Sequence, residues 1–557
     1  VKESDEENAT VDYSVSYEYN LENVGKVTFG NGASIIYEYD GDNIVKTIYN
    51  NGKAGEDNEQ YIYSYTYNDD GSVSEMTDEV SNTVTTYTNS GSVVKKNGTT
   101  IYSNTGSRIN LFGTSFSYSQ SSSTSNNKTT VNDNYTVSLT QGPIVKAETV
   151  LDPFDRTLST SVENKGNTDK NTHYKLTSST EYVEGNNNRQ TNLVSHYTTQ
   201  LAKRSNKILP EKYNNLRISA EWYYNYDSVG RVTSVFKKST NNITYAPANK
   251  TSYTYDKGDL VRYYKYDEAG QISLEVNLED KSAIRYYYNE GGNISQKITY
   301  SNLTEADYSY NYGSDTMTFT PTKSGSTTSL TYKSNGMTDY LTRYNGHTIT
   351  YDKAGNPLNY SGTGMGYSDI TGTMTWNGNL LTSFSTGNSI YKYTYDGDGK
   401  RTSKTYYENI NDTVPTSIIE YIWDGDIITG YRAKFYGTPD DGTQESTEKI
   451  LYYDKTVKVI YNNNDIVGVC VVANEGDPNA SAEINESIEY LDWDQSANYT
   501  FVKDGQGNIT EIYDPSEKVI ISMSYDAYGN MKPNYIGTFV QDIKNKYNAT
   551  GTWWVDL

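Results

Sequence analysis

The chain has 557 residues, with 70 acidic against 47 basic side chains and a formal net charge of −23. This acidic balance argues against a nucleic-acid partner, because proteins that bind nucleic acid cluster Lys and Arg against its phosphates. No apolar stretch approaches the roughly 20 residues that cross a bilayer, so we expect no membrane insertion. The single cysteine, Cys470, excludes an internal disulfide framework and is expected to be a small buried core residue.

Tyrosine dominates the aromatic residues, with 58 Tyr against 10 Phe and 6 Trp, while the hydrophobic fraction is only 34%. A compact globule of this length normally carries more Leu, Ile and Val to fill a thick core. Tyrosine suits a thin β-sheet wall, since its ring packs on the sheet while its hydroxyl reaches water or a polar partner. Aromatic and β-branched residues in alternating runs argue against disorder.

The first 220 residues are expected to form degenerate, Tyr/Ser/Thr-rich β-hairpins. Tyrosines alternate in YSVSYEYN and IIYEYDGDN, and a turn is predicted at Asp152–Arg156. The Ser/Asn-rich run Ser119–Thr130 is predicted to be an exposed loop. The early half of Thr191–Leu216 is the best candidate for a short helix, ending before Pro210.

A repeat of Tyr, then Asp or Asn, two free positions and Gly occurs once before residue 220 and is clearest from residue 221 to residue 530. Copies begin at Tyr67, Tyr226, Tyr266, Tyr288, Tyr351, Tyr395 and Tyr525. The Asp side chain is expected to accept hydrogen bonds from backbone N–H groups ahead of it, and the Gly to adopt positive φ. The predicted structural turn residues are Tyr226, Asp227, Gly230, Tyr266, Asp267, Gly270, Tyr351, Asp352, Gly355, Tyr395, Asp396, Gly399, Tyr525, Asp526 and Gly529.

The intervals between copies are multiples of roughly 20–22 residues, the length of two strands and two turns. Variants in which the Tyr or Gly is replaced fill some of the gaps, as in WDGD at Trp423. Residues 531–557 lack the pattern and form a predicted C-terminal tail or cap, in which Trp553 and Trp554 are expected to cover the end of the sheet.

The closest matches to one known repeat are HTITYDKAGNPLNY, MTWNGNLLTSFS, YKYTYDGDGKRTSKT and YDAYGN. These stretches resemble the YD repeat of the Rhs family, which is shared by bacterial polymorphic toxins, the shell components of Tc toxins and teneurins. The resemblance implies an all-β fold, a spiralling antiparallel sheet of YD hairpins that forms a partial or complete hollow shell. It also implies a bacterial secreted or cell-surface location. Beyond Asn530, the DPxGL-like cleavage site of cargo-carrying members is not found.

Catalytic patterns are almost absent. His173, His196 and His347 are far apart in the sequence and show no metal-ligand spacing. Asp-Gly-Asp occurs at residues 40–42, 396–398 and 424–426, but none extends into a complete calcium loop, so turn capping is the simpler interpretation. GTGMG at residues 362–366 lacks the helix of a phosphate loop. We expect no cofactor, no metal and no enzymatic activity.

Two functions from different classes remain. The first is a shell scaffold that encloses a toxin or other cargo polypeptide, with that cargo or a neighbouring shell segment as its partner. The alternative is a surface adhesin that binds glycans or partner proteins through its Tyr-rich β-surface. A hydrolase acting on cell walls is a distant third, since it would need a cleft holding a pair of carboxyl groups with shifted pKa values.

Overall fold

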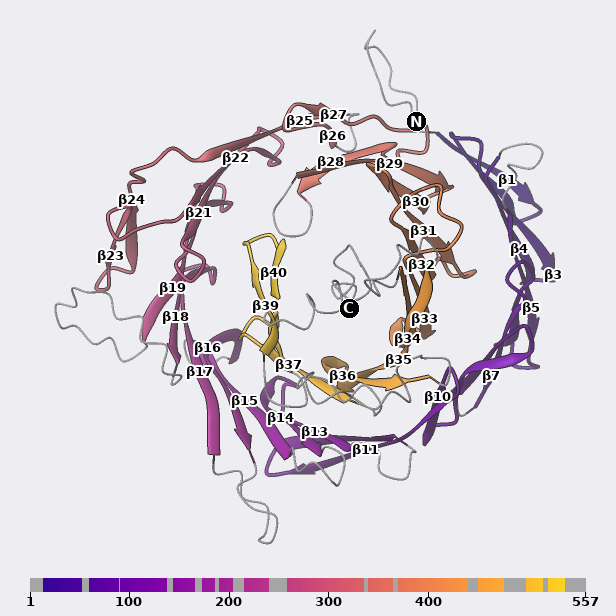
Figure 1. Ribbon diagram of the computed structural model, residues 1–557, viewed down its shortest axis with the longest axis horizontal. Helices are drawn as coiled ribbons and strands as arrows, with labels where there is room; N and C mark the ends of the chain where they lie inside the picture. The colour runs from indigo at the N-terminus through magenta and orange to yellow at the C-terminus, as the bar shows by residue number, and fades with distance from the viewer. Residues whose placement is uncertain are drawn as a thin grey trace, which may run out of the picture.

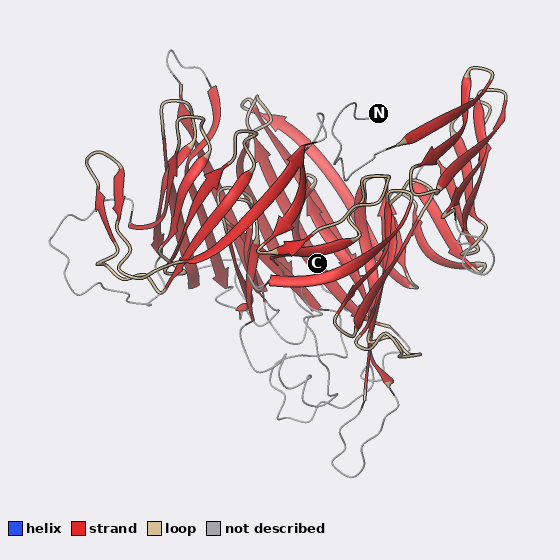
Figure 2. Ribbon diagram, turned by 90° about the horizontal axis from the view of Figure 1, so that it is seen from above, coloured by secondary structure: helices blue, strands red, loops and turns tan. Residues whose placement is uncertain are grey.

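Antiparallel β-strands account for all the regular structure that the computed structural model describes, and no helix occurs among these residues (Figure 2). The structure describes residues 14–52, 60–89, 91–137, 144–165, 173–185, 190–203, 215–239, 258–334, 339–363, 369–438, 449–474, 497–513 and 519–535. The alternating runs of Tyr, Thr and aliphatic residues form these strands because successive side chains then lie on opposite faces. This arrangement confirms the predicted all-β, spiralling antiparallel fold.

The first strands form an outer layer, in which each strand pairs with the next along the chain. The β23–β24 hairpin leaves this sheet, and β22 pairs directly with β25. The strands of the outer layer are β1 (Val15–Asn20), β2 (Asn23–Phe29), β3 (Ser34–Asp40), β4 (Asn43–Asn50), β5 (Gln60–Tyr67), β6 (Val73–Asp78), β7 (Thr83–Thr88), β8 (Gly91–Lys96), β9 (Thr99–Asn104), β10 (Arg108–Leu111), β11 (Thr114–Ser125), β12 (Lys128–Val137), β13 (Ile144–Leu151), β14 (Thr157–Lys165), β15 (His173–Glu184), β16 (Gln190–Lys203), β17 (Asn215–Tyr226), β18 (Val232–Ser239), β19 (Asp259–Tyr266), β20 (Ile272–Asn277), β21 (Ser282–Tyr288), β22 (Ile294–Ser301), β23 (Tyr308–Asn311), β24 (Thr316–Phe319), β25 (Ser326–Ser334), β26 (Asp339–Tyr344) and β27 (His347–Thr348).

The remaining strands form an inner layer, again paired in sequence order. They are β28 (Asn359–Thr363), β29 (Asp369–Asn377), β30 (Leu380–Thr386), β31 (Ser389–Tyr395), β32 (Arg401–Tyr407), β33 (Ser417–Asp424), β34 (Ile427–Gly437), β35 (Ile450–Asn462), β36 (Asp465–Ala473), β37 (Ala497–Lys503), β38 (Ile509–Tyr513), β39 (Val519–Tyr525) and β40 (Met531–Tyr535). Figure 1 shows this layer curling inside the outer layer, with no described strand at the centre of the spiral.

The outer layer closes on itself where the inner layer begins. The backbone N–H of Ser14, just before β1, donates to the carbonyl of Lys353 at 2.9 Å. The Asn31 amide donates to the Asp352 carboxylate at 2.9 Å. The chain therefore completes one circuit before it passes to the inside, and Figure 1 shows the start of the outer layer near the point where the inner layer begins.

Three of the five apolar clusters in the described part of the chain join the two layers. One cluster joins Tyr102, Leu111 and Phe116 of the outer layer to Ile460 and Cys470 of the inner layer. Smaller clusters join Leu201 to Val502 and Trp222 to Ala527 in the same way. A thin wall buries little apolar surface by itself, so contact with a second layer adds to its hydrophobic stabilisation. Cys470 is buried here, which confirms its expected role as a core residue.

Two predictions for the first half of the chain are wrong. The helix candidate within Thr191–Leu216 is instead strand β16, held between β15 and β17 by continuous pairing on both sides. Its Val, Tyr and Thr residues favour an extended backbone when two strands flank it. The Ser/Asn-rich run Ser119–Thr130 is not a loop, because it forms the ends of β11 and β12 around a tight turn at Asn126 and Asn127, both with positive φ.

The predicted boundaries remain untested. Strand β17 spans residue 220 and pairs with its neighbours on both sides, so the sheet continues through this position. Of the predicted C-terminal tail, residues 531–535 form β40, which pairs with β39. Trp553 and Trp554, the predicted cap residues, lie outside the described residues.

Candidate functional site

Each repeat turn is organised by its aspartate. In the first clear copy, the Asp227 carboxylate accepts the N–H groups of Val229 at 3.0 Å and Arg231 at 2.9 Å, while Gly230 has φ of +87°. A β-carbon resists this conformation, so glycine is favoured there. The Asp352, Asp396 and Asp526 carboxylates likewise accept two backbone N–H groups each, whereas Asp267 accepts that of Gln271. The other predicted glycines have φ of +85° (Gly270), +82° (Gly355), +76° (Gly399) and +81° (Gly529).

The residue after the glycine locks the aspartate from the other side. Arg231 Nε donates to the Asp227 carboxylate at 2.6 Å, and Arg156 Nε does the same to Asp152 at 2.7 Å in a turn where Asp155, with φ of +59°, replaces the glycine. Where this residue is asparagine, its amide replaces the guanidinium: Asn356 donates to Asp352 at 3.0 Å. A short side chain with an N–H donor is therefore sufficient at this position. Arginine adds stacking, because the Arg231 guanidinium lies 4.3 Å from the centre of the Tyr266 ring in the next repeat.

The leading tyrosine of each turn ties neighbouring strands together through its hydroxyl. This group donates to a backbone carbonyl near the start of the strand that precedes it in the sheet. We call these contacts the hydroxyl ladder. Its tyrosine members and acceptors are Tyr39 to Val24, Tyr67 to Ile44, Tyr182 to Thr157, Tyr226 to Val194, Tyr266 to Val232, Tyr288 to Ile272, Tyr351 to Leu341, Tyr395 to Leu381, Tyr461 to Ile428 and Tyr525 to Ile509, at 2.6–2.9 Å.

Two variants of the motif show what the ladder requires. Trp376 and Trp423 stand where other repeats have Tyr, and their indole N–H groups donate to the carbonyls of Pro357 at 2.7 Å and Arg401 at 2.8 Å. Phenylalanine would fill the same space without a donor. The hydroxyl ladder therefore explains why Tyr rather than Phe stands at this position of the motif. Our sequence interpretation missed it, although the use of Trp at this position was a visible signal.

The turns of the inner layer also dock onto the outer layer, along a surface that we call the seam. The hydroxyl of Tyr63 in β5 donates to the carbonyl of Tyr395 at 2.8 Å, and that of Tyr49 in β4 donates to the carbonyl of Gly397 at 3.3 Å. A β-carbon on Gly397 would lie only 2.7 Å from the hydroxyl oxygen of Tyr65. Glycine at this second turn position therefore permits close docking.

The same pattern continues along the seam. The hydroxyl of Tyr102 donates to the Asp424 carboxylate at 2.8 Å, and the hydroxyl of Tyr135 donates to the carbonyl of Tyr461 at 3.2 Å. Further on, the N–H of Gly505 donates to the hydroxyl oxygen of Tyr224 at 3.0 Å. Of the predicted Asp-Gly-Asp turns, those beginning at Asp396 and Asp424 lie in the seam.

The last described turn is held by Glu275, a carboxyl group that is almost fully buried on β20. It accepts the backbone N–H of Ala527 at 2.8 Å and the hydroxyl of Tyr286 at 3.1 Å, and Arg262 lies 3.9 Å away. Burial and, to a lesser extent, the nearby Asp526 raise the pKa of Glu275, the Ala527 N–H and Arg262 oppose them, and the net result is a pKa of about 7. Burial likewise raises the pKa of Asp396 to about 6.

One cation is also buried in the seam. The side chain of Lys458 in β35 is buried. Its ammonium group donates to the carbonyls of Thr429 at 3.1 Å and Val459 at 2.9 Å. Burial lowers the pKa of Lys458 to about 7, with Asp424 acting in the opposite sense. These buried titratable groups belong to interlayer packing, since each contacts the other layer or packs against it.

The inward face of the inner layer carries an aromatic and aliphatic stripe. In β33–β36, residues that alternate with the seam residues form one buried cluster that includes Ile419, Phe435 and Val457. In β28–β32 the stripe continues as partly exposed rings, and Tyr391 stacks on Tyr406 with 4.6 Å between ring centres. This face of the inner layer is thus rich in aromatic and aliphatic side chains, buried in β33–β36 and partly exposed in β28–β32.

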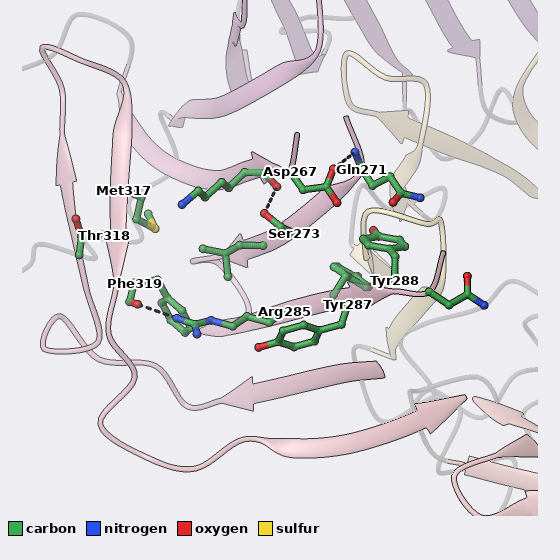
Figure 3. A pocket seen from close by; sticks show the side chains of 13 residues that line it. Asp267, Gln271, Ser273, Arg285, Tyr287, Tyr288, Met317, Thr318 and Phe319 are labelled. Carbon is green, nitrogen blue, oxygen red and sulfur yellow. Dashed lines mark hydrogen bonds between the residues drawn. The ribbon is translucent and has the colours of Figure 1, made fainter. Parts of the chain in front are cut away.

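The convex face carries a pocket of about 740 Å³ beneath the β23–β24 hairpin (Figure 3). Met317 and Phe319 of the hairpin form one wall, and Tyr287, which is 44% exposed, lies on the sheet opposite. Arg285 spans the pocket floor, donates to the carbonyl of Phe319 at 3.0 Å and lies 5.4 Å from the centre of its ring. Lys265 adds a second cation to the lining.

The histidines do not come together. His196 on β16 stacks on Tyr223, while His347 lies on β27 and His173 at the start of β15. Within the described ranges, no group of three or more His, Cys, Asp or Glu residues is arranged to hold a metal ion. Of the GTGMG motif, Gly362 and Thr363 lie in β28, and residues 364–366 lie outside the described ranges. In the same described part of the chain, no helix is long and apolar enough to cross a membrane.

Comparison with known proteins gives similarity only at the level of solved structures. No protein-family model matches the chain, and no curated protein matches its sequence. The crystal structure of TcdB2-TccC3-TEV matches with 12% identity and a TM-score of 0.33, over 92% of this chain and 29% of that chain. TcdB2-TccC3 without its hypervariable C-terminal region matches with 12% identity and a TM-score of 0.21, over 93% of this chain and 28% of that chain. This chain spans less than a third of the length of either.

Proposed function

We propose that this protein is a non-enzymatic β-shell scaffold whose spiral wall encloses a cargo polypeptide. The observation that carries the proposal is the seam. Along it, successive turns of the inner layer dock onto side chains of the outer layer, from Tyr63 near one end of the seam to Glu275 near the other. Such a double wall gives rigidity to sheets that have little core of their own. An inward-curving wall of this kind suits containment.

The inner surface supports a polypeptide as the cargo. Phe384, Tyr391 and Tyr406 form a row of stacked, half-buried rings on this face, and aromatic rings of this kind pack against apolar side chains of many sequences. A lining of this kind suits an unfolded chain, because it offers weak contacts without demanding one shape. The non-enzymatic role is supported by the structural contacts of the two carboxyl groups whose pKa values are raised. Glu275 and Asp396 are both engaged in docking turns at the seam.

The test is a protection experiment with matched fusions. The same unstructured polypeptide, carrying a specific protease site, is joined after Leu557 in one protein and before Val1 in the other. Strand β40 lies at the inner end of the spiral and β1 at its outer end (Figure 1). We expect the first fusion to be cleaved much more slowly than the second. Equal cleavage rates would contradict enclosure.

Small-angle X-ray scattering tests the wall independently of cargo. A solid globule of this length has a radius of gyration of about 24 Å. A spiral wall around a free centre gives a larger radius together with a distance distribution shifted toward long vectors. A value near that of the solid globule would refute the hollow scaffold.

A second candidate function is recognition of glycans or partner proteins by the convex face. The pocket under the β23–β24 hairpin favours it, because Tyr287 offers an exposed ring beside the cations Arg285 and Lys265. Aromatic rings with nearby polar groups are typical of carbohydrate sites. Screening the whole chain on a glycan array, beside a Tyr287→Ala variant, tests this function. Binding that the substitution abolishes would support it.

A further inference from the structure

The pocket beneath the β23–β24 hairpin has two cations on one face of the sheet. Lys265 of β19 lies opposite Leu274 of β20, and Leu274 lies opposite Arg285 of β21. Opposed residues share a face, so these three side chains form a row across neighbouring strands. Because adjacent strands lie about 4.8 Å apart, the backbones of the two cations are about 10 Å apart, with an apolar residue between them. Their long side chains can converge on one group placed above Leu274.

Neither cation is neutralised by an acidic side chain. In the described part of the chain, neither Lys265 nor Arg285 forms an ion pair with Asp or Glu. Among the residues that line the pocket only Asp267 is acidic, and its carboxylate accepts the backbone N–H of Gln271 at 2.8 Å. Two cations against one carboxylate give the lining a formal charge of +1, in a chain whose net charge is −23. This charge matches a single carboxylate better than a phosphate group, which carries nearly two negative charges.

The hairpin that forms the wall of the pocket is fixed to the sheet at two places. In the loop between β23 and β24, the Asp315 carboxylate accepts the hydroxyl groups of Thr233 at 2.5 Å and Ser234 at 2.7 Å, both in β18. At the end of β24, the carbonyl of Phe319 accepts the Arg285 guanidinium at 3.0 Å (Figure 3). The pocket is thus formed before a ligand binds, which lowers the entropic cost of binding.

Apolar side chains line the pocket beside the cations. Met317 and Phe319 of β24 belong to the same apolar cluster as Leu274, and all three contribute to the lining. Their side chains offer no strong hydrogen-bond partner, so they favour an apolar group over the hydroxyl groups of a sugar. Tyr287 lies two residues after Arg285, so its exposed ring is on the same face of the sheet. A ligand that fits this lining carries one anionic group next to one apolar group.

We propose that the pocket binds the C-terminal carboxylate of a partner polypeptide whose last side chain is apolar. Lys265 and Arg285 donate charge-assisted hydrogen bonds to the two carboxylate oxygens, and the last side chain packs against the apolar lining formed by Leu274, Met317 and Phe319. At a chain terminus both groups are attached to one carbon atom, which matches the alternation of cation and apolar residue in the row. This inference rests on the second candidate function, recognition of a partner by the convex face, and does not depend on cargo enclosure.

The test uses the full chain and a short fluorescent peptide that ends in leucine with a free carboxylate. Its controls are the same peptide with an amidated C-terminus and one in which serine replaces the last leucine. Fluorescence anisotropy is expected to show saturable binding of the first peptide. Amidation removes the terminal charge and should abolish binding. Serine should weaken binding about tenfold, the effect of losing one buried leucine side chain.

Variants of the chain place the binding in the pocket. Lys265→Gln should weaken binding of the first peptide about fivefold, because it removes one charged donor from an exposed position. The matched control is Lys323→Gln, which removes an exposed lysine just after the hairpin and outside the pocket, and should leave the affinity unchanged. Arg285→Gln should weaken binding more strongly, with circular dichroism to verify the β-structure. Lys265 does not hold the wall, so its variant keeps the test valid if Arg285→Gln loosens the hairpin.

Three results overturn the proposal: absence of saturable binding, equal affinity for the free and amidated peptides, or equal affinity of the Lys265→Gln and Lys323→Gln variants. If the peptides fail while the glycan array shows binding that depends on Tyr287, this inference is wrong and the second candidate function holds for glycans. If neither peptides nor glycans bind, both this inference and the second candidate function are wrong.

Discussion

The hydroxyl ladder makes a direct prediction about Tyr266→Phe. This substitution keeps the ring, and the Arg231 guanidinium can still stack on it at 4.3 Å, but it removes the hydroxyl that donates to the carbonyl of Val232 at 2.8 Å. Val232 is only partly buried, so water can replace part of the lost bond. A typical intramolecular hydrogen bond contributes about 1 kcal/mol net, and an unsatisfied partly buried carbonyl brings the expected loss to about 1–2 kcal/mol.

The measurement is urea unfolding followed by intrinsic fluorescence, together with hydrogen exchange of the β18–β20 segment. Tyr287→Phe is the matched control, since it removes an exposed hydroxyl from the neighbouring hairpin and should change stability by less than about 0.5 kcal/mol. Tyr266→Trp should retain most of the stability, because Trp376 and Trp423 supply an N–H donor at the same motif position. If the Phe and Trp variants lose equal stability, or if Tyr266→Phe matches the control, the ladder is not what selects tyrosine.

Three further predictions concern the turns and the seam. Gly399→Val should destabilise the protein by about 1–2 kcal/mol in thermal unfolding, because valine resists a φ of +76°, and a loss no greater than that of Thr394→Val on the adjacent strand would contradict this. Gly505→Ala should detach its turn, since the added carbon would lie 2.7 Å from the Tyr224 hydroxyl oxygen, and limited proteolysis should show faster cleavage in the inner layer than for Gln506→Ala, a change at an exposed residue of the same turn. The folded-state pKa of Glu275, about 7, exceeds the ordinary glutamate value of 4.5, so folded protein binds the extra proton and stability falls as the pH rises from about 4.5 to 7; Glu275→Gln should flatten the melting temperature across this window, and an unchanged slope would refute the assignment.

Several features of the wall followed from the sequence because they are local. Alternation of Tyr with Thr, Ser or Val gives a strand, and the Asp227-to-Gly230 spacing gives a turn through hydrogen bonds within five residues. Prediction from short stretches of sequence failed where one pattern of residues is compatible with both a helix and a strand. The TNLVSHYTTQ segment of β16 was misread as helical because pairing with β15 and β17, which no short window contains, settles its conformation.

The candidate site depended far more on tertiary structure. Asp396 reads as one turn residue among many, yet its turn is docked on Tyr49 and Tyr63, more than 300 positions earlier in the chain. Glu275 gives no sequence signal at all. Its shifted pKa arises because the turn of Ala527 covers it, and burial of a carboxyl group depends on what lies above it.

By itself, the sequence determined the repeating unit: strand, Asp-capped turn and glycine with positive φ, each stabilised by contacts among residues close in the chain. The tertiary structure alone decided how these units are used. Small rotations between neighbouring strands accumulate over many hairpins until the wall meets its own beginning at Ser14 and Lys353 and continues inside. Which tyrosines are buried in the seam and which lie on the inner face depends on that summed curvature, and no single repeat encodes it.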